Sequence, residues 1–173
     1  TCEVLTWAVQ ALGQFALDST ALHVIQHTPA CGEKQSALLF ARAQRLFKRG
    51  EYRLSARFGA QAYRHAHDRP SPQAIAAVVF RSFIQAGRYD SAAAWVGRLP
   101  GGDVNLQRDA AALYQRMGML DSAQAILRRL PPGTVADTLR IRQMLFAGTP
   151  SAAQRAADSL EPAGGIDQVS RFY

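Results

Sequence analysis

The sequence has no apolar run long enough to cross a membrane and little that favours β-strands. No stretch of about 18 apolar residues occurs, so the sequence predicts no transmembrane segment. β-Branched residues are sparse and never form an alternating run, which leaves strands little support. Apolar residues still make up 48% of the 173 residues, and alanine, the strongest helix former, is very common. The composition therefore predicts a globular, all-α protein.

Acidic residues are also few. Thirteen Asp and Glu face twenty Lys and Arg, which gives a formal net charge of +7 and favours an acidic partner: a peptide, a nucleic acid or an anionic surface. Much of the surplus lies in one stretch, where Glu51 and Asp68 are the only acids. Its basic residues are Arg42, Arg45, Lys48, Arg49, Arg53, Arg57, Arg64 and Arg69. We interpret this stretch either as the solvated face of an arginine-rich helix or as a contact surface for an acidic partner.

Signatures of catalysis are absent from the sequence. The glycine pairs 101–102 and 164–165 lack the following Lys-Ser/Thr of a phosphate-binding loop. Neither Gly-x-Ser-x-Gly nor His-Glu-x-x-His occurs. Glu3, Glu33 and Glu51 have no partner carboxylate at a spacing that indicates acid/base chemistry. We therefore expect no enzymatic activity and no cofactor.

Cysteine is scarce as well, with Cys2 and Cys31 alone. The first predicted hairpin turns near Asp18, so both cysteines reach its open end. A disulfide there would close a loop of about thirty residues and contribute roughly 3–4 kcal/mol. It would also indicate a periplasmic or extracellular compartment. The alternative is two unpaired thiols in a cytoplasmic protein.

Zinc is the other use that two cysteines could have. His23 and His27 lie four residues apart and, with Cys2 and Cys31, make up four side chains of the types that bind zinc. Their spacing fits no compact zinc motif, and Pro29 disrupts the helix before Cys31. We therefore expect no metal site.

A short phrase recurs along the chain: glycine, any residue, a large apolar residue, two further residues and a small one. It begins at Gly50, Gly87, Gly118 and, in a weaker copy, Gly148, at spacings of 37, 31 and 30 residues. Glycine just past a helix adopts the left-handed conformation without side-chain strain, so it ends the helix. The small residue, such as Ser55, allows two helices to touch.

The residues around each glycine support helical hairpins. Apolar residues stand seven and four places before each glycine, at helical spacing. Helix-breaking segments at residues 68–72, 99–102 and 130–133 separate the predicted hairpins. Asp18, Asp90 and Asp121 are predicted to cap the helices that follow the tight turns. The pattern is helix, tight turn, helix, loop, about five times. The apolar pairs are Ala43 and Leu46, Phe80 and Phe83, Ala111 and Tyr114, and Ile141 and Met144.

The predicted repeat domain covers residues 1–160, and residues 161–173 are expected to be irregular because they contain proline and glycine. The hairpins cover about 3–30, 35–68, 73–99, 105–131 and 135–160. The predicted helices are 3–15, 19–27, 35–49, 53–67, 73–86, 90–98, 105–117, 121–130, 135–147 and 151–160.

This phrase resembles the tetratricopeptide repeat. The resemblance covers about residues 36–160, with a poorer copy at 3–30, and implies a right-handed α-solenoid of about five antiparallel hairpins. The first-helix Trp of that family is missing, and the shorter period in the later copies departs from it. The matching residues are Ala43, Leu46, Gly50, Tyr52 and Ala62, then Gly87, Tyr89 and Ala92, then Ala111, Tyr114, Gly118 and Ala123.

In that family the first helix of each hairpin lines a concave surface that binds protein. The resemblance therefore implies a non-catalytic scaffold that holds an acidic or extended segment, or packs within a larger complex. Arginine forks suit carboxylates, and amides can hold a peptide backbone. The implied partner-binding residues are Gln44, Phe47, Lys48, Arg81, Gln85, Asn105, Arg108, Gln115, Arg116 and Arg142.

Two other functions stay open. A helical repeat that binds nucleic acid fits the basic surplus, but repeats that read bases keep one strict period, and here the period drifts from 37 to 30. A non-catalytic helical arm of a larger enzyme, such as a cell-wall enzyme, predicts a catalytic domain after Tyr173.

Overall fold

The structure is a computed structural model that describes residues 33–66, 70–131 and 133–159. Within these ranges it contains eight α-helices, one short 3₁₀ helix and no strand, which confirms the all-α prediction for this part of the chain. Contacts divide the chain into two compact units, with the boundary between Pro100 and Gly101. We call the part up to Pro100 unit 1 and the part from Gly101 unit 2.

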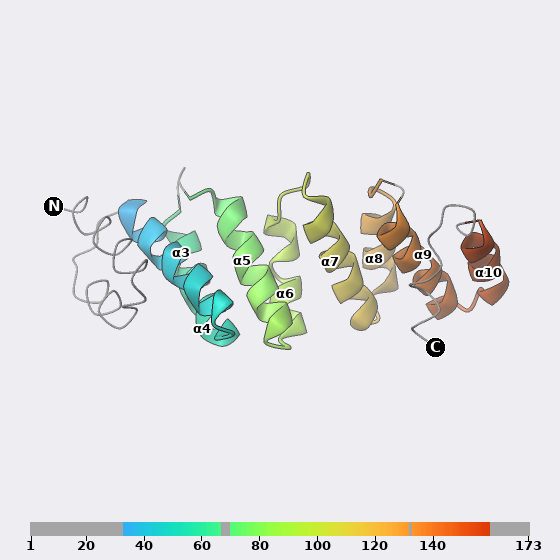
Figure 1. Cartoon of the computed structure of the whole chain (residues 1–173), viewed down its shortest axis with the longest axis horizontal. Coiled ribbons are helices and arrows are strands. Elements are labelled where there is room, and N and C mark those ends of the chain that lie inside the picture. Colours follow the sequence, from blue (N-terminus) through green and yellow to red (C-terminus); the bar gives the residue numbers. More distant parts are fainter. Residues whose placement is uncertain (1–32, 67–69, 132, 160–173) are drawn as a thin grey trace. The chain divides into compact units, whose positions relative to one another are not determined.

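Unit 1 is built from helices that each pack on the next along the chain. α3 packs on α4, α4 on α5 and α5 on α6, and α3 also contacts α5. Their shared core contains Leu39, Ala62, Ile75 and Val79. The helices of unit 1 are α3 (Glu33–Lys48), α4 (Tyr52–Arg64), α5 (Pro72–Gln85), α6 (Tyr89–Ala93) and the 3₁₀ helix η1 (Val96–Arg98) (Figure 1).

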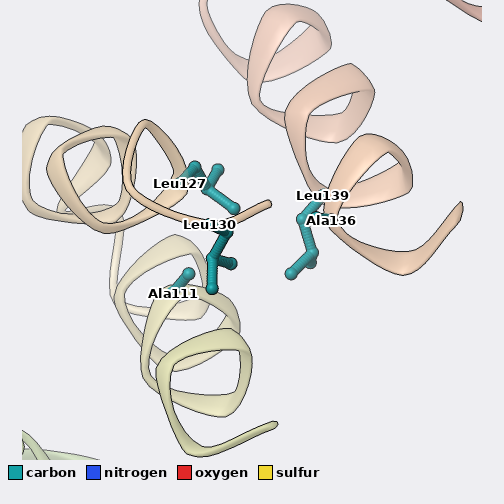
Figure 2. Packing of buried hydrophobic residues seen from close by; sticks show 5 residues of the cluster. All are labelled: Ala111, Leu127, Leu130, Ala136 and Leu139. Carbon is teal, nitrogen blue, oxygen red and sulfur yellow. The ribbon is translucent and has the colours of Figure 1, made fainter. Parts of the chain in front are cut away.

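Unit 2 follows the same scheme. α7 packs on α8, α8 on α9 and α9 on α10, and α7 also contacts α9. Figure 2 shows its core, where side chains from α7, from α8 and the turn after it, and from α9 come together: Ala111, Leu127, Leu130, Ala136 and Leu139. The helices of unit 2 are α7 (Val104–Arg116), α8 (Leu120–Leu127), α9 (Thr134–Phe146) and α10 (Pro150–Asp158).

The turn inside each hairpin closes in the same way. After α3, Gly50 has a φ of 79°, its N–H donates to Phe47 O at 3.0 Å, and the next N–H, of Glu51, donates to Leu46 O at 2.9 Å. This is the Schellman arrangement, which satisfies carbonyls that the helix end leaves without partners. The glycines at 87, 118 and 148 also have positive φ and the same pair of bonds. All four predicted turns are therefore confirmed.

The small residue of the repeated phrase lies where two helices meet. It is Ser55, Ala92, Ala123 or Ala153, and each is at most 2% exposed. The apolar residue seven places before each glycine is buried as well. At Ser55 the contact is polar: its Oγ donates to Ala43 O at 2.7 Å and lies 2.8 Å from Ser82 Oγ. The repeated phrase therefore marks a buried position on each second helix as well as the turns, and at Ser55 this position is a contact between helices.

The predicted N-caps at Asp90 and Asp121 are wrong. The helices begin two residues after each glycine, so both aspartates lie inside the first turn and make no cap bond. Their negative charges still interact favourably with the positive, N-terminal end of the helix dipole. Side-chain caps occur after the longer loops instead. Ser71 and Asp103 accept bonds from the amides three residues on, at 3.2 and 3.0 Å.

The predicted helices 3–15 and 19–27 lie outside the described residues. For the others, predicted and observed helix limits agree within three residues except at the end of the predicted helix 90–98. The predicted helix 90–98 is α6, which ends at Ala93, followed by η1. The predicted helix 121–130 stops at Leu127. A proline disfavours the α-conformation of the residue before it, and Leu99, before Pro100, is extended with φ −73° and ψ 150°.

Candidate functional site

The first helices of unit 1 expose paired amide and cationic side chains. On α3, Gln44 and Lys48 are exposed, and on α5, Arg81 and Gln85 are exposed. In each helix the two residues lie four apart and therefore on one face. Because α3 contacts α5 directly, two neighbouring first helices present the same chemistry. This is the unit 1 part of the predicted binding surface.

Phe47 has a different role from these four residues. It is half-buried, and its ring forms an edge-to-face pair with the Tyr52 ring at a centroid distance of 5.4 Å and an interplanar angle of 66°. Such edge-to-face pairs contribute about 0.5–1.5 kcal/mol beyond area burial. Phe47 therefore braces the turn between α3 and α4, and it leaves only part of its surface for a partner.

In unit 2 the predicted surface residues lie on α7 and α9. Asn105 and Arg116 are exposed, whereas Arg108 and Arg142 are half-buried. The Arg108 guanidinium lies 3.5 Å from the Asp109 carboxylate, with the two side chains 34% and 33% exposed. An ion pair of this length and exposure contributes little. Arg116, which is exposed, and Arg108, whose ion pair is weak, can therefore both meet an acidic group.

Gln115 does not belong to an exposed surface. It is 4% exposed, and its Nε2 donates to Leu139 O at 2.8 Å and to Gln143 Oε1 at 3.1 Å. Gln143 in turn donates to Leu120 O at 2.6 Å. The two amides join α7, α8 and α9 inside unit 2. The predicted role of Gln115 in partner binding is therefore replaced by a role in packing.

A group of cations on the α3–α4 hairpin extends beyond the predicted surface. The Arg42 guanidinium carbon lies 3.5 Å from the centroid of the Phe58 ring. Burial lowers the pKa of Arg42, and the nearby positive charge of Arg57 lowers it further. Between residues 36 and 66 the only acid is Glu51, which pairs with Arg49 at 3.2 Å. The cations of this hairpin therefore crowd together with little acid among them.

Neither a family model nor a curated protein sequence matches this chain. The tetratricopeptide repeat therefore remains a resemblance, carried by the glycines, the small residues and the apolar stripe.

Several predictions fall on residues that the structure does not describe. Cys2 and Cys31, with the disulfide and the compartment inferred from them, lie outside the described residues, as do His23 and His27. The predicted first hairpin at 3–30, with the N-cap at Asp18, and the predicted irregular tail at 161–173 lie outside them too. Among the residues that are described, no group of three or more His, Cys, Asp or Glu comes together to hold a metal ion. Within the same ranges, no helix combines the length and apolar character that crossing a bilayer requires.

Sequence reasoning missed one arginine that orders unit 2. Arg140, on α9, donates from Nη1 to Asp137 Oδ1 at 2.6 Å. Its Nη2 donates to the carbonyls of Leu127 and Leu130, each at 2.8 Å. The side chain thereby links the C-terminal end of α8 to the first turns of α9. The spacing of Asp137 and Arg140 on one predicted helix was a signal for the ion pair, but not for the two carbonyls.

Proposed function

We propose that this chain is a non-catalytic scaffold that binds another protein. In this proposal the helical hairpins form a right-handed α-solenoid of the tetratricopeptide type, and the face made by the first helices holds an acidic, extended segment. The observation that carries the proposal is the repeated pair of exposed amide and cation on α3 and α5, on first helices that touch.

The chemistry of this face suits a peptide. Lys48 and Arg81 supply positive charge for carboxylates, and Gln44 and Gln85 supply both a donor and an acceptor for a peptide backbone. An exposed ion pair contributes only about 0.2–1 kcal/mol. Measurable affinity therefore requires several such contacts in a row, which a repeated helix face provides.

Charge reversal in unit 2 tests the proposal. The probe is a fluorescein-labelled dodecapeptide of alternating Glu and Ser, with binding followed by fluorescence anisotropy at about 50 mM salt, where charge screening is weak. We expect the double variant Arg108→Glu/Arg116→Glu to raise the Kd about tenfold or more, because attraction becomes repulsion at two positions.

The matched control is Arg155→Glu, an exposed arginine on the second helix α10 of the same unit. It reverses one charge of the same kind on a second helix, which is not part of the proposed face, so we expect its Kd to change less than about twofold. Circular dichroism at 222 nm checks that each variant keeps its helices. Equal Kd values for the double variant and the parent protein would remove α7 from the proposed binding face.

A further inference from the structure

A shallow, open hollow lies beside the turn between α3 and α4. Its volume is about 390 Å³, and most of its lining is apolar. Leu54, at its edge, is 42% exposed. An exposed leucine next to an apolar depression of this size offers a seat for one large apolar side chain. The lining residues are Gly50, Glu51, Tyr52, Arg53, Leu54 and Ala86.

A stripe of arginines starts at this hollow and follows α4. Arg53, Arg57 and Arg64 are all exposed, and Arg53 also lines the hollow. At 100° per residue, positions i, i+4 and i+11 lie within about 40° of one another around the helix. With a rise of 1.5 Å per residue, the stripe is about 16 Å long. Apolar seat and basic stripe thus form one continuous surface.

The chain supplies little acid for these arginines. Between residues 36 and 66 the single carboxylate is that of Glu51, and it pairs with Arg49. Arg42 adds a further cation close to Arg57, and the repulsion between them helps to lower the pKa of Arg42. With thirteen acids against twenty basic residues, a second copy of the chain is also a poor source of complementary charge. An acidic partner is the better complement.

We propose that α4 docks an acidic peptide segment of another protein, which places one large apolar side chain in the hollow and carboxylates along Arg53, Arg57 and Arg64. The arginine stripe lies on a second helix and so differs from the first-helix face, although the hollow also reaches Ala86 at the end of α5. An extended segment rises about 3.3 Å per residue, so about five residues cover the stripe. The recognised sequence is a leucine-like residue beside alternating acids.

The hollow favours a peptide over a nucleic acid. Phosphates would neutralise the arginines, but single strands gain much of their affinity by stacking bases on aromatic faces. The one aromatic residue of the lining is Tyr52, and its ring already forms an edge-to-face pair with Phe47. An aliphatic side chain, in contrast, would cover the exposed part of Leu54.

The test uses the full chain and a fluorescein-labelled dodecapeptide that begins with one leucine and continues with alternating Glu and Ser. We expect Arg53→Glu/Arg57→Glu to weaken binding about tenfold or more, and Leu54→Asp to weaken it about fivefold. Replacing the peptide's leucine by serine should cost about the same as Leu54→Asp. In the Leu54→Asp variant this replacement should then have little further effect.

Arg88→Glu is the matched control, because Arg88 is an exposed arginine of unit 1 outside the stripe and the hollow. We expect it to change the Kd less than about twofold. Arg53→Gln/Arg57→Gln, which removes charge without reversing it, serves if circular dichroism shows that the Glu variant loses helix. It should weaken binding by a smaller factor in the same direction.

The outcomes separate this proposal from the first-helix face. If Lys48→Glu/Arg81→Glu abolishes binding while the α4 variants and the leucine have no effect, docking on α4 is wrong and the first-helix face stands. Loss confined to the α4 variants supports docking on α4 alone. If none of the variants changes the Kd of the peptide, both proposed binding surfaces are wrong. Tighter binding of a twelve-nucleotide oligothymidylate, with the same dependence on Arg53 and Arg57, would overturn the peptide assignment.

Discussion

At Gly59, in the middle of α4, the packing against α5 leaves no room for a side chain. A Cβ added there would lie 2.5 Å from Val79 Cγ2, and Val79 is fully buried with a stiff, β-branched side chain. Overpacking costs about 1–3 kcal/mol, and the better helix propensity of alanine offsets about 1 kcal/mol of it. We expect Gly59→Ala to lower the free energy of unfolding by about 1 kcal/mol, measured by urea denaturation.

Val79→Ala provides the rescue for this variant. Alone it leaves a cavity and destabilises, but in Gly59→Ala/Val79→Ala the two methyl groups no longer collide. The two effects should therefore fall short of additivity by about 1 kcal/mol. Gly97→Ala is the matched control, because nothing lies within 4 Å of its added Cβ. Additive losses in the double variant would show that the collision is relieved by some other movement.

At the scale of one element and its neighbour, Arg140 joins the end of α8 to the start of α9. Arg140→Met removes one ion pair and two bonds to carbonyls while keeping much of the apolar stem. Hydrogen bonds to charged groups contribute about 1.5–3 kcal/mol when buried, and Arg140 is 30% exposed. We expect a loss of about 2 kcal/mol in the free energy of unfolding, measured by urea denaturation.

A lysine at position 140 distinguishes the contribution of the positive charge from that of the planar guanidinium group. Arg140→Lys keeps the charge but not the planar fork, so it should recover less than half of the loss. Arg129→Met, at an exposed arginine in the turn after α8, is the control and should change stability by less than about 0.5 kcal/mol. If lysine restored full stability, charge alone would explain the contact.

The helices were predictable because residues close together in the sequence determine where most of them begin and end. Positive φ at Gly50, Gly87, Gly118 and Gly148 is a property of glycine at a helix end, and the apolar stripe needs only the helical period. The role of Gly59 was not predictable. A glycine inside a helix only destabilises it, unless a partner helix approaches too closely for a side chain, and the sequence does not show that approach.

Among the candidate site residues, Gln115 was predicted to lie on the surface because the resemblance to the tetratricopeptide repeat implied it. Its position held a contrary signal, because it lies four residues after Ala111, on the same face of α7 as that buried alanine. Gln44, in contrast, follows buried Ala43 by one residue and is exposed. The surface of each single helix was thus readable from its period. The arginine stripe of α4 also follows from the helical period, but the hollow beside it depends on how α4 packs with its neighbours, which the period does not contain.

At the scale of the whole molecule, the two compact units suggest that a local loss of stability stays local. Each described helix packs mainly on the helices next to it in the chain, as in repeat proteins, whose stability is approximately a sum over repeats and their interfaces. The boundary at Pro100 and Gly101 separates contacts that are mostly internal to each unit. Local opening can then differ between the units.

Hydrogen–deuterium exchange measured by mass spectrometry tests this with two destabilised variants. Gly59→Ala should lower amide protection in α3, α4 and α5 by about fivefold, the factor that corresponds to 1 kcal/mol, and leave α7 to α9 unchanged. Arg140→Met should do the reverse. Each variant serves as the other's control, since both weaken a helix contact in one unit only. Equal loss of protection in both units, from either variant, would show that the whole chain opens as one cooperative body and that the boundary does not limit cooperativity.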